Sequence, residues 1–182
     1  MYEIISRERA GLLDPLNTTY INQSYIKGLA VHYTGAAVVP SMKSIDDIFE
    51  YLNNLQFMYM NRAGFDDIPY SFAISNTSNE IIELRGFQTK SEHSHIEQLN
   101  NTFVSVLWLG GVRDEPNYNA KQALERLVDI MTERYKRKII VNAEDCGEPM
   151  YMFITSTEPR WTKPKRKKVA KWLKKKKITQ QI

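Results

Sequence analysis

The sequence predicts a three-layer α/β domain in which helices flank a central mixed β-sheet. Short β-prone apolar runs alternate with two segments of amphipathic helical pattern, which is typical of a sheet covered on both faces. The 182 residues are 42% hydrophobic and 25% charged, an ordinary composition for one globular domain with a sizeable core. No apolar run approaches the ~18 residues of a membrane span. The single cysteine, Cys146, excludes an internal disulfide.

The first predicted elements follow a lead-in, residues 1–26, that shows no clear hydrophobic period. Residues 28–33 (GLAVHY) are a short β-prone run and predict a buried strand. Ser44 and Asp47 have the spacing of a capping box, and apolar residues then recur on one helical face over residues 45–55. This pattern predicts an amphipathic helix, followed by a loop.

A hairpin and three further elements are predicted in the second half of the chain. Residues 68–75 and 80–85 are β-prone and enclose the turn residues Asn-Thr-Ser-Asn, which predicts antiparallel pairing. Residues 88–101 are polar without a period and predict a loop. Downstream we expect a core strand at 103–109, a helix at 120–134 capped by Asn119, and a strand at 138–141.

Three histidines are available for chemistry. His32 ends a predicted buried strand beside a loop, where sites are commonly built, although a hydrogen-bonded core histidine has the same signature. His93 and His95 form an H-x-H pair that could chelate a metal from one face of a strand or remain solvated in a loop. No CxxC, HExxH, P-loop or GxGxxG pattern occurs in the sequence.

A series of short motifs runs through residues 27–161. In chain order they are 31–34 (VHYT), 67–72 (DIPYSF), 80–86 (EIIELRG), Glu92-His93 followed by Asn100 or Asn101, the strand 103–111, and 119–124 (NAKQAL). Their order and spacing resemble those of type 2 N-acetylmuramoyl-L-alanine amidases. That family includes phage amidase lysozymes and peptidoglycan recognition proteins.

The resemblance implies the fold of that family and raises the question of its zinc chemistry. In the family, two histidines and a third Cys, His or Asp hold a tetrahedral zinc, which polarises an amide carbonyl and lowers the pKa of a bound water. The amide joins the lactyl group of muramic acid to L-alanine. By position, His32 takes the place of the first zinc ligand, and Tyr70 that of a tyrosine that stabilises the tetrahedral intermediate. Without zinc, Tyr70 would instead be a core residue.

The sequence does not match the other two zinc ligands of the family. Asn142 stands where the second histidine is expected, and Met150 falls at the third position. An amide and a thioether do not replace an imidazole and a thiolate on zinc. A rebuilt site would need Cys146 or its neighbouring aspartate to approach His32, with His93 as a further ligand. We therefore expect no cofactor, and zinc only if such a site forms.

The charges are divided between two regions. The last 23 residues contain eleven Lys and Arg and no acid, which leaves 14 basic against 21 acidic residues before Arg160, a net charge of −7. Residues 162–182 therefore form a basic tail beyond an amidase-like domain at 27–161. Its candidate polyanion-binding residues are Lys163, Lys165, Arg166, Lys167, Lys168, Lys171, Trp172, Lys174, Lys175, Lys176 and Lys177.

Several partners fit the basic tail. Lysine clusters bind the phosphates of nucleic acid by counterion release, and Trp172 could stack on an exposed base. An anionic membrane surface, an anionic cell-wall polymer or an acidic protein surface would also fit, and the tail could equally be solvated. Because the rest of the chain is acidic, we expect binding to polyanions to belong to the tail alone.

Two functions from different classes follow from the sequence. The first is a phage or prophage protein with a degenerate zinc site, acting as a non-catalytic binding or virion structural module that contacts other virion proteins. The alternative is an active zinc amidase, an endolysin or virion-associated lysin with a rearranged metal site. The absence of a secretory signal in the first residues indicates the host cytoplasm or the virion.

Overall fold

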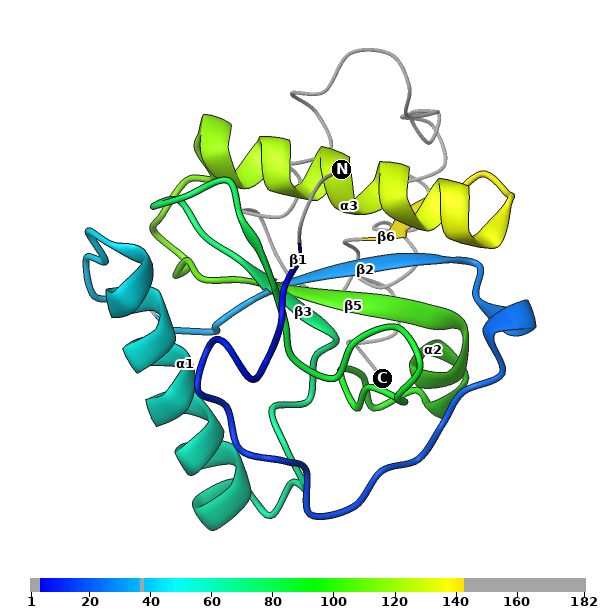
Figure 1. Cartoon of the computed structure of the whole chain (residues 1–182), viewed down its shortest axis with the longest axis horizontal. Coiled ribbons are helices and arrows are strands. Elements are labelled where there is room, and N and C mark those ends of the chain that lie inside the picture. Colours follow the sequence, from blue (N-terminus) through cyan, green and yellow to red (C-terminus); the bar gives the residue numbers. More distant parts are fainter. Residues whose placement is uncertain (1–3, 37, 143–182) are drawn as a thin grey trace, which may run out of the picture.

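Two parallel strands, β2 (Gly28–Tyr33) and β5 (Phe103–Trp108), lie at the centre of the sheet (Figure 1). The computed structural model describes residues 4–36 and 38–142. Both strands are nearly continuous runs of buried residues, as expected for strands covered on both faces. The predicted strands at 28–33 and 103–109 are therefore confirmed.

Four shorter strands complete a six-stranded mixed sheet in the described part of the chain. They are β1 (Ile4–Ile5), β3 (Phe72–Ile74), β4 (Ile81–Glu83) and β6 (Ile140–Asn142), and the strand order is β1-β4-β3-β5-β2-β6. The β3–β4 hairpin is antiparallel, as predicted, and the other four pairings are parallel. The segments expected to share one sheet do so.

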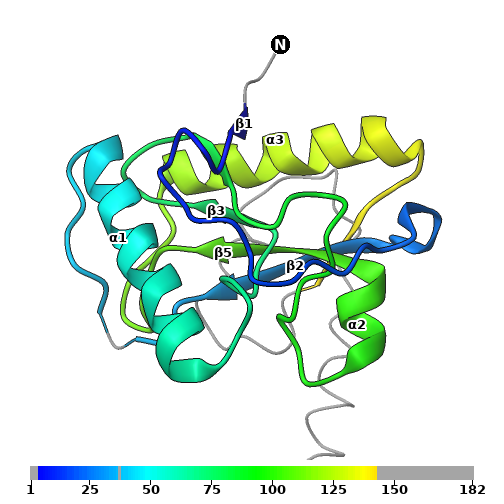
Figure 2. The same ribbon diagram turned by 60° about the horizontal axis from the view of Figure 1, so that its bottom comes forward.

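The two long helices cover opposite faces of this sheet, which confirms the three-layer prediction (Figures 1 and 2). α3 (Tyr118–Tyr135) packs on one face, and α1 (Ile45–Met58) packs on the other. Side chains along β5 alternate accordingly: Val106 belongs to the core under α3, and Leu107 to the core under α1. Below, these are called the α3 face and the α1 face.

The start of α1 was predicted correctly, but its end was not. The Ser44 side chain accepts from the Asp47 amide and the Asp47 carboxylate accepts from the Ser44 amide, so the expected capping box is present. The helix then continues into a π-helical turn, η2 (Tyr59–Ala63), which ends at Gly64 with φ 75°. The loop predicted from residue 61 was therefore wrong for its first three positions.

Other local predictions also needed correction. The lead-in contains β1 and a 3₁₀ turn, η1 (Gln23–Tyr25), and the polar loop at 88–101 contains α2 (Glu97–Thr102). The cap of α3 is Asn117, which accepts from the Ala120 amide, and not Asn119. β1 was invisible because it is two residues long and pairs with residues 77 positions away. The strand predicted at 68–75 begins only at residue 72, after a proline that cannot donate to a ladder.

None of the helices within residues 4–36 and 38–142 is long and apolar enough to cross a membrane.

Candidate functional site

Three residues singled out in the sequence come together at one place. His32 lies near the end of β2, Tyr70 lies two residues before β3, and His93 lies between β4 and α2. Nε2 of His32 is 2.8 Å from Nδ1 of His93, a hydrogen-bonding distance, and their ring centroids are 4.8 Å apart. The Tyr70 ring centroid is 5.3 Å from that of His32. His32 pairs in register with Leu107, so this cluster lies on the α1 face.

A second tyrosine borders the histidine pair. Tyr59, the first residue of the π-helical turn, meets Tyr70 edge to face with ring centroids 6.5 Å apart. Burial raises the pKa of Tyr59, and its hydrogen bond with Tyr70 opposes this only in part. The Tyr59 phenol therefore stays protonated near neutral pH and is a hydrogen-bonding group without charge.

His32, one member of the histidine pair, is also uncharged. Burial lowers the pKa of His32 to about 3, because a charged imidazole would lose its hydration there, and the neighbouring His93 lowers it further. His32 is thus neutral near pH 7. A neutral imidazole carries one N–H and one acceptor nitrogen, so one nitrogen of the contact between His32 and His93 donates a proton and the other accepts it.

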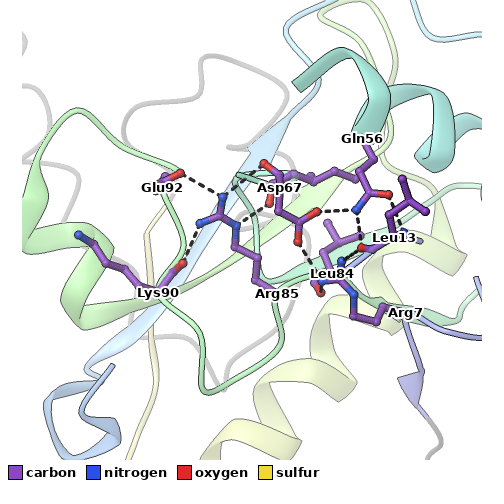
Figure 3. A network of polar contacts seen from close by, with 9 residues as sticks. Arg7, Leu13, Gln56, Asp67, Leu84, Arg85, Lys90 and Glu92 are labelled. Atoms are coloured by element: carbon purple, nitrogen blue, oxygen red, sulfur yellow. Dashed lines mark hydrogen bonds and ion pairs between the residues drawn. The ribbon is translucent and has the colours of Figure 1, made fainter. Parts of the chain in front are cut away.

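Arg85 bonds to both the segment that precedes Tyr70 and the segment that precedes His93 (Figure 3). Its side chain is only 6% exposed. Nε donates to the Ile68 carbonyl at 2.9 Å, Nη1 donates to the Lys90 carbonyl at 3.0 Å, and Nη2 forms a 3.0 Å ion pair with Glu92. These bonds join Ile68, two residues before Tyr70, to Lys90 and Glu92, which lie within three residues before His93. Arg85 thereby fixes the two side chains relative to each other.

A buried carboxylate ties the amino-terminal segment to the same loop (Figure 3). Asp67, with a side chain 2% exposed, accepts from Arg7 Nη1 at 2.9 Å and from Gln56 Nε2 at 2.7 Å. Gln56 also exchanges two hydrogen bonds with the backbone of Leu13. These bonds satisfy the polar groups of the buried Asp67 and Gln56 side chains, so the network fixes the start of the loop that contains Tyr70.

The described residues do not fit a zinc site of the expected kind. No group of three His, Cys, Asp or Glu that could hold a metal ion occurs within residues 4–36 and 38–142. His32 and His93 supply two imidazoles, one ligand fewer than the three that the family's zinc site needs. Asn142 pairs in register with Ala30, and therefore stands on the face of His32, where the family's second histidine was expected.

Several predicted site residues lie outside the described residues. They are Cys146, Met150 and the basic tail with Lys163, Lys165, Arg166, Lys167, Lys168, Lys171, Trp172, Lys174, Lys175, Lys176 and Lys177. The third histidine, His95, is exposed and separate from the contact between His32 and His93.

The sequence analysis missed two parts of the site. Tyr59 was not considered, because the helix was expected to end at residue 55. Arg85 appeared in the sequence only as part of the motif 80–86, and its salt bridge with Glu92 and its three carbonyl contacts come from the fold. The motif 80–86 was the available signal, since it contains this arginine.

Comparison with known proteins identifies the fold. No protein-family model matches the sequence, and no curated protein matches it. Among solved structures, Drosophila PGRP-LB has a TM-score of 0.74 at 18% identity, over 91% of this chain and 99% of that chain. The fold is that of the peptidoglycan recognition proteins.

Two other PGRP structures agree with this result. Apis mellifera PGRP-SA has a TM-score of 0.75 at 19% identity, over 88% of this chain and 99% of that chain. A Drosophila PGRP-LB mutant in complex with tracheal cytotoxin has a TM-score of 0.73 at 19% identity, over 87% of this chain and 96% of that chain. The fold expected from the motifs is confirmed.

Proposed function

We propose that this chain is a phage or prophage protein that uses its PGRP fold to bind peptidoglycan without cleaving it, as a binding or virion structural module. The proposal is supported by the PGRP fold and by the complex of one such protein with tracheal cytotoxin. The observation that carries it is the direct hydrogen bond between His32 and His93. This hydrogen bond gives the two histidines a role in the site that needs no metal.

The chemistry of the site suits binding of an uncharged polar ligand. His32 is neutral near pH 7, and Tyr59 and Tyr70 contribute phenol hydroxyls and ring faces. Imidazole and phenol groups donate and accept hydrogen bonds, and the ring faces cover apolar parts of a sugar or peptide. A muropeptide offers uncharged groups of this kind in its amides and sugar hydroxyls.

A sedimentation assay with insoluble peptidoglycan tests the binding function. We expect the full-length protein to co-sediment, and His93→Ala and Tyr70→Ala to bind at least about tenfold more weakly, a loss of about 1.4 kcal/mol. His95→Ala is the matched control, because it removes an exposed histidine from the same segment. Failure of the wild type to sediment, or an equal loss in the His95 variant, would contradict the proposal.

Metal content and product release test the non-catalytic part. We expect substoichiometric zinc and no release of peptide from peptidoglycan, because Asn142 and Met150 stand at ligand positions. The alternative, an active zinc amidase, is favoured by the proximity of His32 and His93, which a rebuilt site with Cys146 would need. One tightly bound zinc per chain, lost in both His32→Ala and Cys146→Ser and accompanied by amide cleavage, would establish the amidase instead.

The basic tail is proposed to hold the protein on a polyanion or an acidic partner. If it neutralises about six phosphates, affinity for duplex nucleic acid should fall roughly a thousandfold between 50 and 200 mM salt. Deleting residues 162–182 should abolish this binding at physiological ionic strength and leave the melting temperature nearly unchanged. If Trp172→Ala instead weakens binding more than paired Lys→Gln changes do, and salt has little effect, the tail's partner is a protein groove.

A further inference from the structure

The negative net charge of the chain before the tail is not evenly spread over the folded part. Five exposed basic side chains gather where η1 meets the end of α3: Lys27, Arg134, Lys136, Arg137 and Lys138. We call them the basic surface. Neither contributing segment, 22–28 or 134–142, contains an Asp or Glu. The two segments lie side by side at one end of the molecule (Figures 1 and 2).

Hydrogen bonds to neutral acceptors hold the two arginines in place. Arg134 donates from Nε and Nη2 to Gln23 Oε1, at 3.2 and 3.0 Å. Arg137 Nη1 donates to the carbonyls of Ser24 and Ile26, at 3.2 and 3.3 Å. Acceptors of this kind orient a guanidinium without cancelling its charge, so both arginines remain able to attract an anion.

Exposed aromatic rings accompany these charges. Tyr25 is 63% exposed and lies between the two residues whose carbonyls bind Arg137. The guanidinium carbon of Arg134 lies 4.9 Å from the centroid of the Phe87 ring. Arg134 also lines a hollow of about 290 Å³ together with Tyr20, which is 73% exposed. Exposed tyrosines interleaved with fixed cations offer stacking platforms beside phosphate-binding groups.

We propose that the basic surface, together with Tyr25, binds single-stranded nucleic acid. The cations would contact the phosphates, and the tyrosine ring would stack on an unpaired base. The macrodipole of α3 favours cations at its C-terminal end without any ligand. It does not account for Lys27 and Lys138, because they lie outside that helix. A wall polymer or an anionic membrane fits the charges but supplies no base for the tyrosine.

The basic surface is separate from the histidine site. It lies at the amino ends of β2, β5 and β6, where the Ile140 amide donates to the Lys27 carbonyl. His32 lies four residues beyond Gly28, the first residue of β2. That separation is about 13 Å along the strand. The proposal therefore does not depend on peptidoglycan binding. From net charge, we expected the tail alone to bind polyanions. The proposal adds the basic surface as a second site, so the folded part and the tail would contact the same nucleic-acid strand.

Fluorescence anisotropy with labelled oligo(dT), on the full-length chain and over a range of salt concentrations, tests the proposal. Replacing Lys27, Arg134, Lys136 and Arg137 by Gln should reduce the slope of log affinity against log salt by about 3, near 0.7 for each lost phosphate contact. The matched control replaces four exposed cations elsewhere by Gln: Arg9, Lys43, Arg62 and Arg113. It should change the slope by less than about 1.

Two further variants keep the test decisive. Lys27→Gln with Lys136→Gln spares the arginines that hold η1, and should still lower the slope by about 1.4 if the quadruple variant unfolds. Tyr25→Ala should weaken binding about tenfold without changing the slope, whereas Tyr118→Ala, at the other end of α3, should not. Equal slopes for the surface and control variants, or no effect of Tyr25→Ala, would overturn the proposal.

Discussion

Arg85 provides the sharpest test of how the fold builds the histidine site. The change Arg85→Ala removes the donors from the carbonyls of Ile68, Lys90 and, at 3.3 Å, Asp67. Ile68 and Asp67 are fully buried residues, at 0% and 1% exposure. A buried acceptor left unpaired costs about 1–3 kcal/mol, so two of them predict a loss of about 2–6 kcal/mol in the free energy of unfolding. That is a large part of the 5–15 kcal/mol typical of a domain.

Urea unfolding measures this loss, and two companion variants interpret it. Glu92→Gln removes only the ion-pair partner, whose side chain is 41% exposed, and should cost less than about 1 kcal/mol. Arg85→Lys restores one donor and the charge, and should recover part of the loss. Peptidoglycan binding should weaken in Arg85→Ala even under conditions where the protein remains folded. A loss below about 1 kcal/mol for Arg85→Ala, or equal losses for Arg85→Ala and Glu92→Gln, would refute the reasoning.

Three shorter predictions concern His32, the α1 cap and the strand pair β2–β6. Because the pKa of His32 is lowered to about 3 in the folded chain, protons bind more strongly to the unfolded chain. The contribution of His32 to the free energy of unfolding is therefore fully present above about pH 6.5 and is lost as the pH falls, by about 2 kcal/mol at pH 5. His32→Gln should flatten that pH dependence of urea unfolding, and an unchanged profile would contradict the pKa. Ser44→Ala should cost about 1 kcal/mol in the same assay, since it removes the side chain that caps α1; a neutral result would mean that the cap is dispensable. Gly28→Ala should lower the melting temperature by several degrees, because the added methyl meets the Ile140 carbonyl, and an unaffected melting curve would argue against this pairing.

Local signals in the sequence predicted the elements whose causes are local. The capping box fixed the start of α1, and the apolar run at 28–33 is β2 to the residue. Elements that depend on distant partners were missed or misplaced. β1 exists because it pairs with β4, and α2 is a short helix without a side-chain cap at its start. Its polar sequence carries no hydrophobic period.

The candidate site shows the same division. His32, Tyr70 and His93 were selected from motif order, and their residue types already limit the chemistry to hydrogen bonding, aromatic contact or metal binding. Their mutual distances could not be read from the motifs, because the three residues lie up to 61 positions apart in the chain. Arg85 sets one of these distances through carbonyls of residues that have no distinctive side chain.

The sequence determined the net charge of each part of the chain, but not how the charges are arranged in space. The sequence alone established the residue types and the concentration of eleven cations after residue 159, while the missing zinc ligands and the division into an acidic domain and a basic tail stay predictions. Only the tertiary structure decided which of these groups meet. Packing strands from distant parts of the chain brought two histidines within hydrogen-bonding distance, and it gathered five cations at one end of an acidic domain. Composition is additive along the chain, whereas hydrogen bonds and electrostatic interactions depend on distance, which the fold sets.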